Sequence, residues 1–316
     1  MTDSAVNRRA VPDGARFFMR PLGDGWMQRW FDWPVAAGIT AKGSILFQCG
    51  RGDIIEKYLE SFAHWHEQGW HVSSFEWRGQ GGSGRLAADP RVGHIADFAI
   101  WIDDMAACWA QWIAEVPGPH IAMGHSMGGH LVLRAIIENR INPAGAVLVA
   151  PMLGFDAGVV PVSVIAPIVR FLARRFPERR AWAENERPTL GHVRRQPFLT
   201  HDDARYADEL WWKSEKPELD MGPPSLCWVA QAHASTVLTE QPGQLERVHT
   251  PILMIGTHGD RLVSPAAIER FAARLSNATL KMFDKTVAHE ILREVDSVRD
   301  EAMALIDQFL EGQSAS

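Results

Sequence analysis

One serine is enclosed by glycines where the chain changes its pattern. In the stretch IAMGHSMGGHLVLRAI, Ser126 has Gly124 two residues before it and Gly128 two residues after it. A short apolar run precedes the serine and apolar residues at helical spacing follow it, so a sharp strand-to-helix turn is expected. Glycines permit such a turn because a side chain on either flank would strike the neighbouring backbone. The turn exposes the hydroxyl, with His125 expected to point away from it, and we predict that Ser126 is a nucleophile.

A serine hydroxyl is a weak nucleophile near neutral pH, so a base must take its proton and a carboxylate must orient that base. Asp260 follows the apolar run PILMIG and precedes a Ser-Pro pair typical of a helix start. His289 follows the next apolar run, ATLKMF, and precedes the last helical segment. Open α/β sheets gather catalytic groups at the ends of such strands. We therefore predict His289 as the base and Asp260 as its partner, with Asp284 as the alternative acid.

The oxyanion that forms during acyl transfer needs two N–H donors. One donor is expected from Met127, the residue that follows the nucleophile. The other is expected from the loop in ILFQCGRGDIIEKY, where Gly50 and Gly52 let the backbone come close to the site. We predict the amide of Arg51 as this second donor, with the amide of Gly50 as the alternative.

Two other motifs are predicted to take no part in the chemistry. His64, His66 and His71 in HWHEQGWH resemble a metal cluster, but the acidic and later histidine ligands that such a site needs are missing. The stretch WRGQGGSGR contains a G-x-G-x-x-G pattern, but no helix opens directly after it and no acid follows about 20 residues on. The sequence therefore predicts an enzyme that needs neither a metal nor a cofactor.

The elements that must position these groups alternate along the chain. Short, nearly continuous apolar runs are typical of parallel strands that are covered on both faces, and segments with helical spacing lie between them. The stretches RFFMR and GWMQRWFDWP predict an opening β-hairpin at the sheet edge. The pattern therefore predicts an α/β fold, with a mostly parallel central sheet flanked by helices. The runs that predict the central strands are SILFQCG, HVSSFEW, HIAMG, AGAVLVAP, PILMIG and ATLKMF.

The alternation stops in the second half of the chain. We predict a first core part over residues 1–151, an inserted and mainly helical cap over 152–240, and a second core part over 241–316. Within the cap, the apolar stretch VVPVSVIAPI precedes the arginine-rich stretch RFLARRFPERR. This order fits a segment that meets a lipid surface transiently, and it equally fits a helix that is buried on one side and solvated on the other.

Composition sets the broad class. The chain has 316 residues, of which 46% are hydrophobic and 22% are charged, enough for one large core with an insertion. The net charge of -6 argues against nucleic acid as a partner. Three scattered cysteines without a C-x-x-C pair predict neither disulfides nor a zinc site, and they fit a reducing compartment. No apolar segment follows the early arginines, so a cytoplasmic location without a secretory signal is expected.

Several of these motifs together resemble one family. The stretches GHSMGG, GTHGDRLVSP, VAHEILRE, GRGDIIEKY and EWRGQGGSGR are similar to the lysophospholipase and monoacylglycerol lipase-like branch of the α/β-hydrolases. The resemblance implies the α/β-hydrolase fold, a triad of Ser126, Asp260 and His289, and a cap that shapes an acyl pocket. The chain departs from the family at Cys49, where histidine is common, and at Glu76, where aspartate is frequent.

These observations predict a serine hydrolase that cleaves carboxylic esters through an acyl-enzyme intermediate. A small-molecule lipid ester with one acyl chain is the expected substrate. Monoacylglycerol is favoured, because the arginines of the cap are expected on a solvated helix face instead of converging on one phosphate. The alternatives are a lysophospholipase, a carboxylesterase for short or medium chains, and a ligand-binding protein on the same fold. The sequence makes no prediction of oligomeric state.

Overall fold

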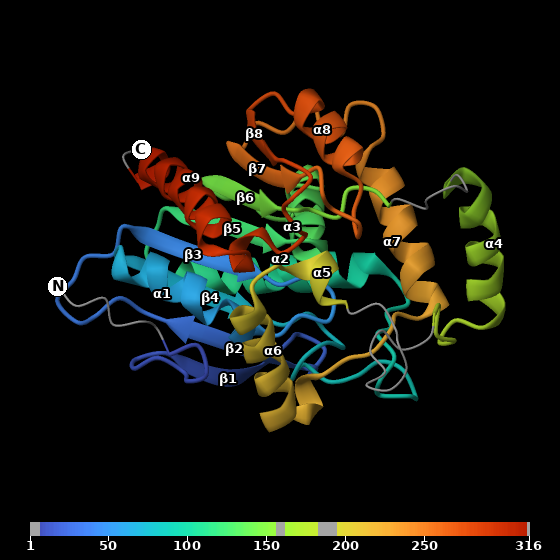
Figure 1. Cartoon of the computed structure of the whole chain (residues 1–316), viewed down its shortest axis with the longest axis horizontal. Helices are drawn as coiled ribbons and strands as arrows, with labels where there is room; N and C mark the ends of the chain where they lie inside the picture. Colours follow the sequence, from blue (N-terminus) through green and yellow to red (C-terminus); the bar gives the residue numbers. More distant parts are fainter. Residues whose placement is uncertain (1–6, 156–161, 183–194, 315–316) are drawn as a thin grey trace.

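The computed structural model of the protein describes residues 7–155, 162–182 and 195–314. Its strands are β1 (Arg16–Pro21), β2 (Met27–Trp33), β3 (Gly43–Gln48), β4 (Trp70–Phe75), β5 (His120–His125), β6 (Gly145–Val149), β7 (Ile252–Thr257) and β8 (Ala278–Phe283). They form one sheet in the order β1-β2-β4-β3-β5-β6-β7-β8 (Figure 1). From β4 to β8 the neighbouring strands are parallel, while β1 and β2 form an antiparallel hairpin at one edge. The predicted hairpin and the predicted, mostly parallel sheet are both confirmed.

Helices cover both faces of the sheet (Figure 1). Alternate residues of β3 point to opposite faces, with Ile45 and Phe47 in one apolar cluster and Leu46 in the other. The cluster around Ile45 also takes in residues of α1 (Leu59–Glu67) and α9 (Asp296–Ser314). The cluster around Leu46 takes in residues of α2 (Phe98–Glu115), α3 (Met127–Ile137) and α8 (Pro265–Arg274). Burial on both faces explains why the central strands are apolar along their whole length.

The segment between β6 and β7 is mainly helical, as predicted. Its described elements are α4 (Val162–Arg175), α5 (Gln196–Leu199), α6 (Asp203–Glu215), η2 (Pro217–Leu219) and α7 (Leu226–Thr239). Helix α7 packs on the core through Trp228 and Ala232, whereas α4 lies on the outer side of α7 (Figure 1). Ile168 and Phe171 of α4 are 57% and 71% exposed. Contact of the cap with a membrane surface stays a prediction, as do its boundaries at residues 152 and 240, and the start of its apolar stretch lies outside the described residues.

The register of the sheet brings the predicted site residues to the carboxyl ends of the parallel strands. Gln48 at the end of β3 pairs with Gly124 in β5, and Thr257 at the end of β7 pairs with Phe283 of β8. The loops that follow these parallel strands therefore open on the same side of the sheet. Within the described ranges, no helix is both long enough and apolar enough to cross a membrane.

Candidate active site

Ser126 lies on the sharp turn between β5 and α3, and its backbone explains the flanking glycines. Its φ of 53° and ψ of -118° fall in a region that residues with a side chain rarely adopt. A Cβ on Gly124 would lie 2.5 Å from the carbonyl carbon of Gly128, and a Cβ on Gly128 would collide with the carbonyl oxygen of Gln48. Neither position can hold a side chain without moving the backbone, so the strained turn depends on both glycines.

Asp260 and His289 meet at the carboxyl ends of β7 and β8. The Nδ1 of His289 donates a hydrogen bond to Oδ2 of Asp260 at 2.5 Å. The other oxygen of Asp260 accepts the backbone N–H groups of Leu262, at 2.8 Å, and Val263, at 3.0 Å. These bonds fix the carboxylate and orient the imidazole, because a carboxylate can only accept. The alternative acid, Asp284, is exposed and bonds to Thr286 instead.

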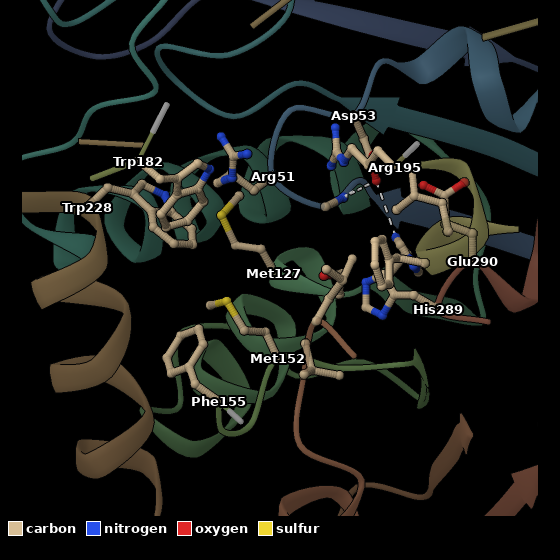
Figure 2. Close-up of a pocket in the computed structure, with 17 residues that line it drawn as sticks. Arg51, Asp53, Met127, Met152, Phe155, Trp182, Arg195, Trp228, His289 and Glu290 are labelled. Atoms are coloured by element: carbon tan, nitrogen blue, oxygen red, sulfur yellow. Dashed lines mark hydrogen bonds and ion pairs between the residues drawn. The ribbon is translucent and has the colours of Figure 1, made fainter. Parts of the chain in front are cut away.

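Ser126 and His289 line the same cavity, which has a volume of about 480 Å³ (Figure 2). His289 is 3% exposed and Asp260 is 6% exposed, so bulk water has little access to their hydrogen bond. The structure therefore brings together the three residues of the predicted triad. The remaining wall is largely apolar and includes Met127, Met152 and Trp228.

The backbone donors around the site favour Arg51 over Gly50 for the oxyanion. The amide of Gly50 donates to Oδ2 of Asp53 at 2.9 Å, and that of Gly52 donates to Oε1 of Gln80 at 2.8 Å. The amide of Arg51, between them, finds no acceptor in the part of the chain that the structure describes. Met127 is the first residue of α3, so its N–H has no partner within the helix. Both amides belong to residues that line the cavity.

His125 corrects one expectation, because it lines the cavity instead of pointing away from it. Its Nδ1 lies 2.9 Å from the hydroxyl of Tyr58 and 3.2 Å from Oδ2 of Asp53, and its ring centroid is 4.8 Å from that of His289. Burial, the largest effect, lowers the pKa of His125 and favours the neutral ring. Asp53 and Tyr58 were not predicted from the sequence, although both lie in the same stretch GRGDIIEKY that contains Arg51.

A buried ionic network supports the segment that carries His289. The Nζ of Lys57 lies 2.7 Å from Asp53, 2.7 Å from Glu290 and 3.2 Å from Glu209. Arg293, in the short helix η3 (Ile291–Arg293), bonds to both of these glutamates. A buried charge is stable only when it is paired, so the network holds α6 and the residue after His289 against η1 (Ile55–Tyr58).

The surroundings of His289 set the pH range in which it can act as a base. Burial lowers its pKa, but the charge and hydrogen bond of Asp260, assisted by Glu290 and Asp53, outweigh burial and raise it above the ordinary 6.5. Only the neutral imidazole can accept the serine proton, so activity should fall as pH drops through this raised pKa. We expect the acid limb of kcat/KM to have its midpoint above pH 6.5. A pH profile measured on a neutral ester tests this, and a midpoint well below 6.5 would contradict it.

The fold and this arrangement define an α/β-hydrolase. Residues 39–296 match the family model described as "Serine aminopeptidase, S33". The chain is 30% identical to lysophospholipase L2 of Escherichia coli (strain K12), over 96% of this chain and 94% of that protein. It is 25% identical to the probable lysophospholipase L2 of Haemophilus influenzae, over 84% of this chain and 82% of that protein. The chain belongs to this family and is an ester hydrolase.

Solved structures show the same fold. A soluble variant of the monoglyceride lipase from Saccharomyces cerevisiae, in complex with a substrate analog, matches with a TM-score of 0.74 at 18% identity and covers 96% of both chains. A thermostable carboxyl esterase from Bacillus coagulans, in complex with glycerol, matches with a TM-score of 0.73 at 15% identity, over 96% of this chain and 100% of that one. At these identities the likeness concerns the fold alone.

Proposed function

We propose that this protein is a lysophospholipase that cleaves the acyl ester of a single-chain phospholipid. The hydroxyl oxygen of Ser126 attacks the ester carbonyl while His289 takes the hydroxyl proton. The amides of Arg51 and Met127 bind the oxyanion that forms. Collapse of this intermediate expels the glycerol oxygen, which receives the proton from His289. Water, deprotonated in turn by His289, then attacks the acyl-enzyme, and the fatty acid leaves as His289 returns the proton to the oxygen of Ser126.

The observation that carries a single-chain substrate is that the catalytic cavity shares two wall residues with a second, apolar cavity. Phe155 and Trp182 line the catalytic cavity and also a second cavity of about 670 Å³ between α4 and α7. The second cavity is mostly apolar and is lined by residues such as Ile165, Val229 and Leu238. An acyl chain that extends from Ser126 past Phe155 would enter it. Each methylene buried there contributes about 0.8 kcal/mol.

The choice of headgroup departs from the expectation of monoacylglycerol. Relatives that cover most of the chain are named lysophospholipases. The expectation of a neutral headgroup rested on the arginines of the cap stretch, and Arg174 and Arg175 are indeed exposed. The side chains of Arg51 and Arg195, however, both line the catalytic cavity. We therefore favour lysophospholipid and keep monoacylglycerol as the comparison.

We predict that kcat/KM is highest for lysophosphatidylcholine among esters of one chain length, with monoacylglycerol, triacylglycerol and an aryl ester as the comparisons. For any one headgroup, kcat/KM should rise up to about fourfold per added methylene until the second cavity is full. Ala230→Trp should remove this gain for long chains but not for short ones, since Ala230 lines that cavity. Val295→Trp, at an exposed position outside it, is the matched control. A preference for triacylglycerol, or a chain-length profile that Ala230→Trp does not change, would refute the single-chain assignment.

A further inference from the structure

We propose that the guanidinium groups of Arg51 and Arg195 form a phosphate-binding site in the wall of the catalytic cavity, which takes the phosphodiester of the substrate headgroup. This inference rests on the proposed function, because it names how that function selects its substrate. Arg51 comes from the loop after β3, and Arg195 directly precedes α5. Both side chains line the cavity that holds Ser126 and His289.

Arg51 carries a positive charge that no carboxylate of the described residues pairs. Its Nη1 donates to the carbonyl oxygen of Gly222 at 3.0 Å, and its guanidinium lies 5.6 Å from the ring centroid of Trp228. These contacts orient the group without neutralising it. Among the described residues, no carboxylate lies within ion-pair distance of Arg51 or Arg195, whereas the buried Arg293 has two carboxylate partners. Arg51 and Arg195 are both partly buried, and a partly buried arginine without a carboxylate partner is unusual, because desolvation of a charge needs compensation.

The other charged groups of the cavity wall do not supply this compensation. Asp53 and Glu290 line the cavity, but each is bound to Lys57 at 2.7 Å. His125 and His289 are held by Asp53 and Asp260 respectively. The carboxylates are thus committed to partners inside the protein, while the two arginines stay available to an anion from outside.

The pKa of Arg51 agrees with two positive charges that face the same cavity. Burial, which is the largest effect, and the positive charge of Arg195 together lower the pKa of Arg51 to about 9, and the negative charge of Asp53 partly opposes them. Arg51 is therefore still charged at neutral pH, in an unfavourable environment. A bound anion would relieve both the desolvation of Arg51 and its repulsion by Arg195.

The position of the pair suits a headgroup instead of an acyl chain. Figure 2 shows Arg51 and Arg195 along the upper wall of the cavity in this view, with Met127 below them and Met152 and Phe155 lower still. Phe155 and Trp182 line both this cavity and the apolar second cavity. An ester bound at Ser126 can therefore send its chain toward Phe155 and its polar end toward the arginines.

The chemistry of the guanidinium defines the ligand class. Its planar set of N–H donors matches two oxygens of a phosphate, and hydrogen bonds between charged partners are about twice as strong as neutral ones. The glycerol of a monoacylglycerol offers no negative charge to this pair. We expect the site to discriminate by charge between two esters that carry the same chain.

The test measures kcat/KM on lysophosphatidylcholine and on monoacylglycerol of the same chain length, in the full-length protein. Arg195→Gln should lower the ratio of the two values about 10- to 100-fold, the range expected for loss of a charged hydrogen bond. Arg51→Gln should lower the same ratio, which is informative even if its total activity also falls. Arg174→Gln, in an exposed arginine of α4, is the matched control and should leave the ratio within about twofold of the unmodified protein's. Labelling with a fluorophosphonate shows that each variant is folded.

A second measurement separates this inference from the proposed function. Soluble sn-glycero-3-phosphocholine should inhibit hydrolysis of a short aryl ester competitively, and Arg195→Gln should raise its inhibition constant about 10-fold or more. If the unmodified protein prefers monoacylglycerol, the proposed function fails, while inhibition that depends on Arg195 would still support the site. If it prefers lysophosphatidylcholine and neither arginine variant changes the ratio, the site is refuted and the function stands. Inhibition by inorganic phosphate alone, with no effect of the phosphodiester, would overturn the headgroup assignment.

Discussion

Replacement of Ser126 by alanine should abolish ester turnover and leave the fold intact. We expect kcat to fall about 10⁴- to 10⁶-fold, because the attacking oxygen is lost and only binding and oxyanion stabilisation remain. Alanine keeps the Cβ of serine, so the strained backbone at φ 53° is no worse in the variant. Steady-state kinetics on an aryl ester and a thermal unfolding curve measure the two effects.

The matched control for this variant is Ser276→Ala, which removes a hydroxyl from an exposed position away from the cavity. It should retain the activity of the unmodified protein and its labelling by a fluorophosphonate, whereas Ser126→Ala should lose both. If Ser126→Ala keeps more than a few per cent of the turnover, Ser126 is not the nucleophile.

Asp260→Asn should lower kcat about 10³- to 10⁴-fold while the site keeps its shape. The amide oxygen can still accept the N–H groups of Leu262 and Val263, which leaves the NH₂ group facing Nδ1 of His289. Nδ1 must then accept a hydrogen bond, so the proton of the neutral ring moves to Nε2. A ring protonated there cannot take the proton of Ser126. The loss should appear in kcat and in kcat/KM alike.

The pH profile of Asp260→Asn provides a second readout. Asp260 is the first contributor that raises the pKa of His289 against burial, so its loss should move the acid limb to lower pH. Asp284→Asn is the control, since Asp284 is exposed and bonds to Thr286. If Asp284→Asn cripples the enzyme and Asp260→Asn does not, the acid of the triad has been misassigned.

Local patterns in the sequence were enough to predict the strands, the layers and the candidate triad. Parallel strands buried on both faces must be apolar along their length, so they are visible without a structure. The glycines at positions 124 and 128 report a backbone that no side chain tolerates, and this constraint also lies within a few residues of Ser126. Asp260 and His289 were found because parallel strands place their carboxyl ends at one edge.

The structure was needed for groups whose roles depend on packing between distant segments. His125 turns into the cavity because Asp53 and Tyr58, far away in the chain, offer it polar partners. Its place within the turn gives no sign of that direction.

The side chains of Arg51 and Arg195 line one cavity for the same kind of reason. The site emerges only once the helical segment between β6 and β7 has packed on the core, where the network around Lys57 joins η1, α6 and η3. Spacing along the chain carries the information for a turn or a strand, because neighbours in sequence set both. Spacing carries no information about which charges face a cavity without a partner. That depends on which carboxylates, distant in the chain, are already bound to other groups.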